Sequence, residues 1–165
     1  MITPSQTVGP YFAIGLPWPD GRDVAPDGDV WIRGRILDGE REPIPDGLVE
    51  TWQADPSGRY EVGGFRGFGR CPTDEDGAYA IRTVKPGAVN GQAPHIAVSV
   101  FARGLLNRVV TRVYFPEDAD AHASDPVLSG LDEDARATLI AVRDGDGYRF
   151  DVRLQGPDET VFFAV

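Results

Sequence analysis

Short polar turns divide this 165-residue chain into segments too brief for long helices. Asp-Gly, the dipeptide that most strongly favours tight β-turns, begins at positions 20, 27, 38, 46, 76, 144 and 146. Runs with the apolar content and alternation of β-strands cover residues 30–37, 48–53, 78–84, 96–103, 109–115, 148–154 and 160–163. This density of strands and turns predicts an all-β fold, an immunoglobulin-like or prealbumin-like β-sandwich.

One short helix is predicted over residues 132–142. Its first turn is acidic, which complements the positive end of the helix dipole, and Ser129 with Asp132 resembles a capping box. Apolar side chains recur at helical spacing from Leu131 to Val142. The glycine-rich stretch 63–69 is expected to be a loop; it neither follows a predicted strand nor opens a helix, so it is a weak candidate for binding phosphate.

Residues 1–28 contain five prolines and little periodicity. This pattern predicts an extended N-terminal arm rather than a strand or helix, followed by a single β-sandwich domain over residues 29–165. The arm's segment 7–12 is too apolar for a free tail. We therefore expect it to pack on the body of the protein or on a partner chain.

The net charge of −10 argues against nucleic acid and anionic membrane surfaces as partners. No apolar run is long enough to span a bilayer. The only cysteine, Cys71, excludes an intrachain disulfide and is expected to be half-buried in a strand. With no secretory signal recognisable, these features favour the cytoplasm.

The predicted strand 96–103 has two unlike faces. One face is apolar core, and the other looks like the floor of a pocket, with His95 at one end and Arg103 at the other. Arg103 ends an apolar strand and precedes a glycine, so its guanidinium could hold a carboxylate bidentately; a plain surface charge is the alternative. The expected ligand is a small anion.

Metal-binding signals in the sequence are incomplete. A second histidine two residues after His95 would make a strong ligand pair, but Ala97 stands there. His122 lies in an acidic stretch and is expected to be a solvated loop histidine. We therefore expect no metal on this chain. Hydrolytic sites are also disfavoured, because there is no Gly-x-Ser-x-Gly motif and too few histidines remain for a triad.

Several stretches together resemble the α subunits of the intradiol ring-cleavage dioxygenases that act on protocatechuate. In chain order they are TPSQTVGPY (3–11), ETWQAD (50–55), TVKPG (83–87), APHI (93–96), FARG (101–104), TRVYF (111–115), YRFD (148–151), QG (155–156) and ETVFF (159–163). Each stretch is weak alone, but they span nearly the whole chain in one order.

The resemblance implies a partner. Such enzymes pair two homologous β-sandwich subunits in a large hetero-oligomer, and the β subunit binds Fe(III) through two tyrosines and two histidines. Here Ala97 replaces one histidine, Ala88 and Val89 stand where one tyrosine is expected, and the 63–69 loop lacks the other. The chain therefore resembles the subunit without metal, and His95 would be kept for packing or hydrogen bonding.

The implied reaction uses O2 to cleave protocatechuate between its hydroxylated carbons, giving 3-carboxy-cis,cis-muconate. This chain would hold no self-sufficient catalytic residue but would line the substrate pocket next to the partner's iron. The residues implied to bind substrate are Thr7, Gly9, Pro10, Tyr11 and Arg103. Two alternatives remain: a self-sufficient intradiol dioxygenase with atypical ligands, and a β-sandwich carrier or interaction domain without catalysis.

Overall fold

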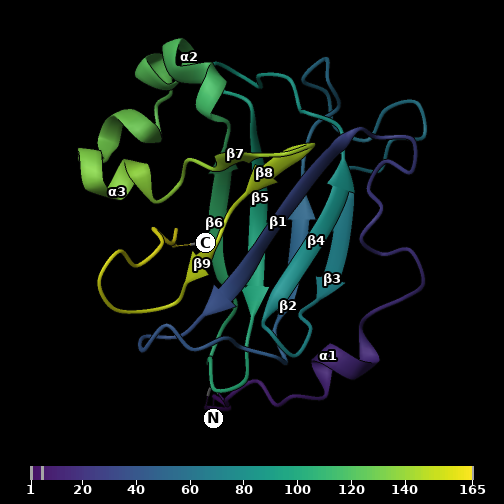
Figure 1. The fold of residues 1–165 in the computed structure, drawn as a ribbon, viewed down its shortest axis with the longest axis vertical. Coiled ribbons are helices and arrows are strands. Elements are labelled where there is room, and N and C mark those ends of the chain that lie inside the picture. Colours follow the sequence, from purple (N-terminus) through teal and green to yellow (C-terminus); the bar gives the residue numbers. More distant parts are fainter. Residues whose placement is uncertain (1, 5, 165) are drawn as a thin grey trace.

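Two β-sheets packed face to face form the body of the protein in the computed structural model, which describes residues 2–4 and 6–164 (Figure 1). The first sheet contains β4 (Ala78–Thr83), β1 (Val30–Leu37), β8 (Gly147–Arg149) and β7 (Val142–Asp144) in that order, with β9 (Val152–Arg153) beside β1. The second contains β3 (Phe68–Pro72), β2 (Leu48–Trp52), β5 (His95–Phe101) and β6 (Val109–Tyr114). The predicted all-β sandwich is confirmed.

The core lies between the sheets and follows the predicted alternation. In β5, Ile96, Val98 and Val100 are almost completely buried, while the residues between them lie on the outer face. A smaller apolar cluster, which includes Tyr114 and Leu128, lies beneath the helices. The inward faces of the strands thus account for the stability of the sandwich.

The predicted strand 148–154 is interrupted. It divides into β8 and β9, which are both parallel to β1. At Phe150, between them, the N–H donates to Arg33 O, but the carbonyl accepts from the Tyr79 hydroxyl rather than from a backbone N–H of β1. Gly34 is required opposite, since a Cβ there would lie 1.8 Å from Phe150 O. The predicted strand 160–163 is an extended segment instead, attached to β6 by isolated hydrogen bonds.

Most Asp-Gly pairs do not close hairpins. The turn at residues 144–147 joins β7 to β8, but Asp76-Gly77 leads from β3 in one sheet to β4 in the other. The glycine-rich loop ends at Gly67, since Gly69 already lies in β3, a strand that was not predicted over this range. Cys71 lies in the same strand and is buried.

The described residues form three short α-helices, more than the one predicted. α3 (Glu133–Ala137) is shorter than residues 132–142 and is capped by Asp132, which accepts from Ala135 N; the proposed role of Ser129 was wrong. α3 ends early because Leu139 O accepts from Tyr114 N, so the chain pairs with β6. None of these helices is long and apolar enough to cross a membrane.

α2 (Ala119–Ser124) corrects another expectation. It follows the 3₁₀ turn Pro116–Asp118 and precedes a second one, Leu128–Gly130. His122, expected to be a solvated loop histidine, lies in α2 and is only 6% exposed, because α2 packs over β6. The sequence did not show this burial.

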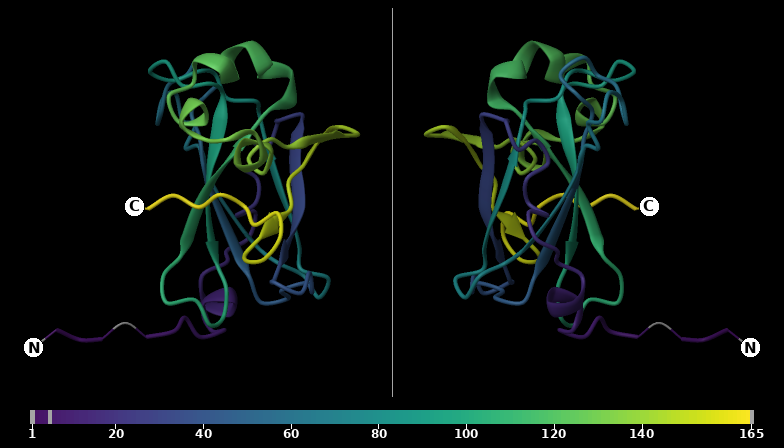
Figure 2. Two further views of the ribbon diagram at one scale, coloured as in Figure 1. Left: turned by 90° about the vertical axis from the view of Figure 1, so that its left-hand side faces the viewer. Right: turned by 90° about the vertical axis from the view of Figure 1, so that its right-hand side faces the viewer.

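The N-terminal segment has two parts. Residues 2–4 lie away from the sandwich (Figure 2), and α1 (Phe12–Gly15) interrupts the predicted extended arm. After α1 the chain packs on the body: Arg70 N donates to Gly21 O, and Arg82 N donates to Arg22 O. The proposed boundary between arm and domain at residues 28 and 29 stays a prediction.

Candidate functional site

The arm is attached to the turn that follows β5. Val8 N donates to Leu105 O at 2.8 Å, and Gly104 N donates to Val8 O at 3.2 Å. Gly104 has a φ of +95°, a conformation that suits glycine, and so allows this turn to present its backbone to the arm. Thr7 and Gly9, which flank Val8, therefore lie next to the end of β5.

The same turn carries Arg103. The structure thus brings the five residues implied to bind substrate to one end of the sandwich, where the N-terminal segment meets the β5–β6 connection (Figure 1). Four of them come from the arm and the fifth from the residues after β5. Nothing in their sequence spacing predicts this meeting, which depends on the two Val8 hydrogen bonds.

Arg103 forms an ion pair with Asp46 in which Nε lies 3.1 Å from Oδ2. The register of the second sheet explains the pair. Leu48 in β2 and Phe101 in β5 are Cα partners in an antiparallel pair, so the residues two positions beyond them also face each other. The Arg103 side chain is 63% exposed and that of Asp46 only 21%.

The predicted site residues on the arm are exposed. Tyr11 is 77% exposed, and Thr7, Gly9 and Pro10 are exposed as well. Phe12 anchors the segment, with its ring centroid 6.2 Å from that of Phe101. A small ligand held beside these exposed residues would stay largely in water unless a partner covered it.

A half-exposed aromatic surface lies along β2 and β3 of the second sheet. Trp52 stacks on Tyr60 and Trp18 stacks on Phe68, each pair with centroids 5.9 Å apart. The guanidinium of Arg70 lies 4.8 Å from the Trp18 ring centre. Partly exposed aromatic and arginine side chains of this kind are enriched at protein–protein interfaces. We call these five residues the aromatic face.

His95 is buried and already engaged. Its Nδ1 lies 2.8 Å from Ala93 O, which can only accept, so Nδ1 carries the proton. Its ring centroid lies 5.5 Å from that of Tyr114. Burial lowers the pKa of His95, and the nearby Arg112 guanidinium lowers it further, outweighing the Ala93 hydrogen bond. The ring is therefore neutral near pH 7.

The surroundings of His95 do not fit a ferric ion. Ala97 offers no donor, and its partner across the β5–β6 pair is Arg112. Arg112 Nη1 donates to Gln92 Oε1 at 2.9 Å and to the Tyr114 hydroxyl at 3.2 Å, so a permanent cation lies close to the imidazole. Within residues 2–4 and 6–164, no group of three or more His, Cys, Asp or Glu side chains is placed to hold a metal.

His122 has a structural environment too. Its ring packs edge-on against Tyr114 with centroids 5.8 Å apart, so both histidines contact one tyrosine. Burial lowers the pKa of His122 despite the carboxylates of Asp118 and Asp125 nearby.

The sequence pointed to Arg103 as a candidate but did not point to Asp46, its ion-pair partner. The only signal at Asp46 is that it lies in an Asp-Gly turn before a predicted strand.

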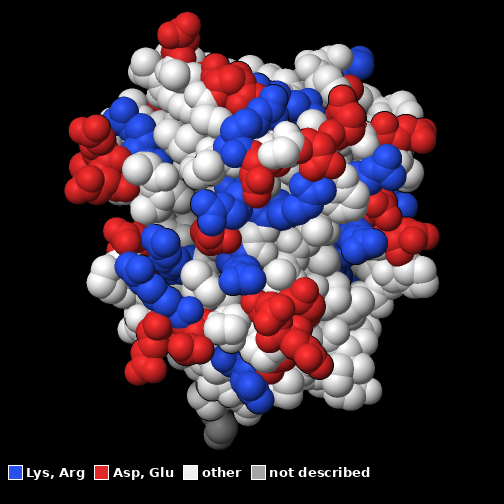
Figure 3. Space-filling model, in the orientation of Figure 1, with Lys and Arg blue, Asp and Glu red and all other residues white. Residues whose placement is uncertain are grey.

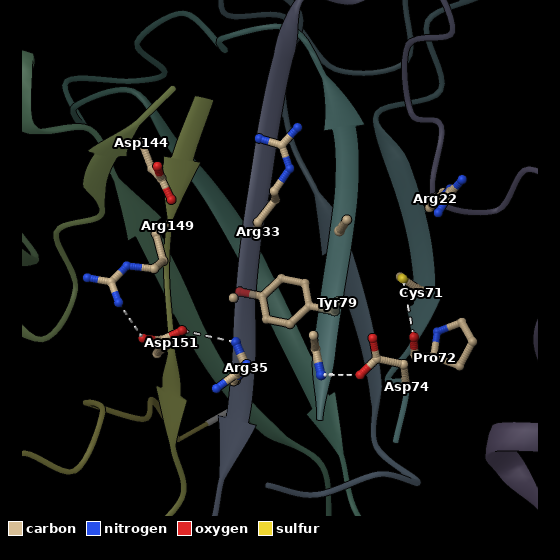
Figure 4. Close-up of a pocket in the computed structure, with 13 residues that line it drawn as sticks. Arg22, Arg33, Arg35, Cys71, Pro72, Asp74, Tyr79, Asp144, Arg149 and Asp151 are labelled. Atoms are coloured by element: carbon tan, nitrogen blue, oxygen red, sulfur yellow. Dashed lines mark hydrogen bonds and ion pairs between the residues drawn. The ribbon is translucent and has the colours of Figure 1, made fainter. Parts of the chain in front are cut away.

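A separate hollow of about 620 Å³ lies on the outer face of the first sheet and includes none of the predicted site residues (Figure 4). Lys and Arg side chains gather across this side of the molecule (Figure 3). The guanidiniums around the hollow do not converge: Arg33 pairs with Asp146 at 2.6 Å, and Arg149 pairs with Asp151 at 3.5 Å. We therefore place the candidate site at the arm.

Comparison with known proteins adds independent information. A family model described as Dioxygenase matches residues 18–94. The chain is 44% identical to the protocatechuate 3,4-dioxygenase alpha chain of Burkholderia cepacia, over 99% of this chain and 97% of that protein. It is 39% identical to the protocatechuate 3,4-dioxygenase beta chain of the same organism, over 79% of this chain and 66% of that protein.

A solved structure agrees with the fold. The dioxygenase domain of a dioxygenase–carbohydrate-binding fusion from Streptomyces sp. SirexAA-E superposes with a TM-score of 0.67 at 28% identity, covering 93% of this chain and 98% of that one. The fold and the near-complete coverage by the alpha chain agree with the resemblance inferred from sequence. The chain belongs to the intradiol dioxygenase family, alongside the alpha chains of protocatechuate 3,4-dioxygenase.

Proposed function

We propose that this chain is the alpha subunit, the one that binds no iron, of a protocatechuate 3,4-dioxygenase. The enzyme would use O2 to cleave protocatechuate between its hydroxylated carbons, yielding 3-carboxy-cis,cis-muconate. The observation that carries the proposal is the 44% identity over nearly the full length of both chains to a protein of that name. The donor set around His95, which does not suit iron, favours the alpha role.

The iron belongs to the partner in this proposal. Intradiol dioxygenases use non-haem iron, and Fe(III) would be held by a homologous beta subunit. The contribution of this chain would be to bind and orient the substrate and to exclude water from one side of the pocket.

Arg103 would bind the substrate's carboxylate. Protocatechuate carries a carboxylate on the ring, and a guanidinium is the side chain best suited to hold it through two parallel hydrogen bonds. The arm residues Thr7, Gly9, Pro10 and Tyr11 would form the wall beside the ring. A Cβ added at Gly9 would have nothing within 4 Å, so the backbone there is open to close approach by a ligand or partner.

The beta subunit would cover the exposed residues. The aromatic face and the arm together offer apolar and aromatic surface that a homologous chain could bury. Assembly in a larger hetero-oligomer follows from the alpha and beta pairing of the relatives. We place the complex in the cytoplasm, since the only cysteine is buried and free.

Expression of the chain alone and together with the beta subunit tests the proposal. The chain alone should contain no stoichiometric iron and should not consume O2 with protocatechuate. The co-expressed complex should contain iron and cleave the ring. Iron with ring cleavage by the lone chain would instead favour the self-sufficient enzyme, and an inactive complex that still binds aromatic carboxylates would favour the carrier domain.

A further inference from the structure

We propose that Asp46 is a positioning residue that gives the site its preference for a carboxylate-bearing substrate by orienting Arg103. This inference rests on the proposed function, because it requires Arg103 to face substrate. Asp46 itself would not touch the substrate. It would fix the direction in which the guanidinium points.

The backbone around Asp46 is firmly held. Gly47 N donates to the Thr73 hydroxyl at 2.8 Å, and that hydroxyl donates to Ile44 O at 2.8 Å. Thr73 N also donates to Gly47 O at 3.0 Å, and Thr73 is buried. The turn that carries Asp46 is therefore anchored on both sides by one buried threonine.

The turn that carries Arg103 is anchored as well. Ala102 is buried, Leu105 N donates to Ala102 O at 3.2 Å, and the arm binds Gly104 and Leu105 through the backbone of Val8. Two fixed backbones thus face each other across the β2–β5 register, and the ion pair connects their side chains. Asp46 is the only carboxylate paired with Arg103 among the described residues.

The contact is at the inner end of the guanidinium, where Asp46 Oδ2 lies against Nε. Neither terminal nitrogen donates a hydrogen bond to another of the described residues, and together the two can bind a second carboxylate through two parallel hydrogen bonds. Without this contact, an arginine side chain that is 63% exposed would sample many rotamers. The ion pair therefore reduces the conformational entropy that the side chain loses when substrate binds.

This arrangement predicts an effect specific to the substrate's carboxylate. In the complex with the beta subunit, Asp46→Ala should raise KM for protocatechuate about tenfold with little change in kcat. Catechol, which has no carboxylate, should be turned over with unchanged kinetics. Asp46→Glu keeps a carboxylate that can pair with the Arg103 guanidinium and should retain most of the wild-type KM.

The matched control is Asp27→Ala. Asp27 also precedes a glycine in an Asp-Gly turn, but it is exposed and has no ion pair among the described residues. Its replacement should leave both substrates unaffected. Equal losses for protocatechuate and catechol in Asp46→Ala would show a merely structural role and overturn the inference.

A second readout does not depend on catalysis. In the full-length chain, the ¹⁵N–¹H heteronuclear NOE of Arg103 Nε–H should fall in Asp46→Ala and stay near the wild-type value in Asp46→Glu, which keeps the charge. An unchanged NOE, or a KM for protocatechuate that is unchanged or lower in Asp46→Ala, overturns the inference. An inactive wild-type complex would overturn the proposed function itself, whereas an active complex insensitive to Asp46 would overturn only this inference.

Discussion

Ala97 and Arg112 are Cα partners on β5 and β6, so a guanidinium lies beside the position where a second metal-binding histidine could stand. Arg112 is held there by Gln92 and Tyr114. The chain therefore differs from an iron site in two ways. It lacks a metal-binding side chain at position 97, beside His95, and the guanidinium of Arg112, a permanent cation, lies close to that histidine.

Restoring one histidine should not restore iron. We expect Ala97→His to bind no stoichiometric iron, because the Arg112 charge repels a ferric ion and no tyrosine ligand is supplied. Iron analysis after reconstitution and desalting measures this, with Ala97→Ser as the control. Stoichiometric iron in Ala97→His would contradict our account of Arg112.

Arg103→Ala should lower kcat/KM for protocatechuate in the assembled enzyme. The expected loss corresponds to about 2–4 kcal/mol of transition-state stabilisation. Folding should be little affected, because the side chain is largely exposed. Steady-state kinetics and thermal unfolding measure the two effects. Arg108→Ala, an exposed arginine in the same β5–β6 connection, is the control; equal kinetics for both variants would remove Arg103 from the site.

The arm should matter to the assembled enzyme more than to the fold. Val8→Pro removes the N–H that donates to Leu105 O, while Val8→Ala keeps it. We expect Val8→Pro to change the stability of the lone chain by no more than about 1 kcal/mol. In the complex it should lower activity by about 10–100-fold, because misplaced wall residues disturb substrate orientation. Equal activity in both variants would show that this hydrogen bond does not position the arm.

The sequence predicted those strands whose own residues alternate. β1 and β5 each contain a regular apolar series, so local pattern and burial agree. β3 was missed because its inward residues are Gly69 and Cys71, which are small and give little signal. The helix at residue 132 was extended too far because Leu139, apolar at helical spacing, is buried by pairing with β6 instead.

The site was harder to predict than the fold. Arg103 drew attention because it ends a strand, but the arm residues came from the resemblance and not from any local physical signal. The Asp46–Arg103 pair depends on the register between β2 and β5, which joins residues far apart in the chain. Likewise, the burial of His122 depends on how α2 packs over β6. Such long-range relationships become visible only in three dimensions.

Glu117 should make stability depend on pH in the acid range. Burial alone would raise the pKa of Glu117, but hydrogen bonds from the Tyr148 hydroxyl and from Lys85 Nζ outweigh it and lower the pKa to about 2. A lowered folded-state pKa stabilises the protein above the ordinary value of 4.5, and this stabilisation is lost as pH falls from there to about 2. After allowance for solvent screening, the loss should be about 1 kcal/mol.

Urea unfolding between pH 6 and pH 2 (about the range in which carboxylates titrate) measures this dependence. Glu117→Gln should be less stable than wild type at neutral pH and should approach it as the pH falls. Glu40→Gln, at an exposed position, is the control and should follow the wild-type curve. Parallel curves for wild type and Glu117→Gln across the range would contradict the assigned bonding of Glu117.

Asp125 should be the most sensitive carboxylate in the helical region. It is completely buried, and its oxygens accept from Ala93 N, Val127 N and Leu128 N at 2.8–3.0 Å. Asp125→Ala would leave all three donors without a partner, which should cost about 3 kcal/mol or more of unfolding free energy. Ala93 also provides the carbonyl bonded by His95 Nδ1, so the same change should loosen the start of β5.

Denaturant unfolding of Asp125→Ala measures the cost, and hydrogen exchange at β5 locates it. The control is Asp120→Ala, an exposed aspartate in α2, which should change stability by no more than about 0.5 kcal/mol. The loss of stability in Asp125→Asn should lie between those of the other two variants. Its carbonyl oxygen can still accept from Val127 N and Leu128 N, but its amide group faces Ala93 N, so two donors meet there. A cost for Asp125→Ala as small as that of the control would mean that water replaces the carboxylate, and that the packing of α2 rather than this hydrogen-bond set holds His95 in place.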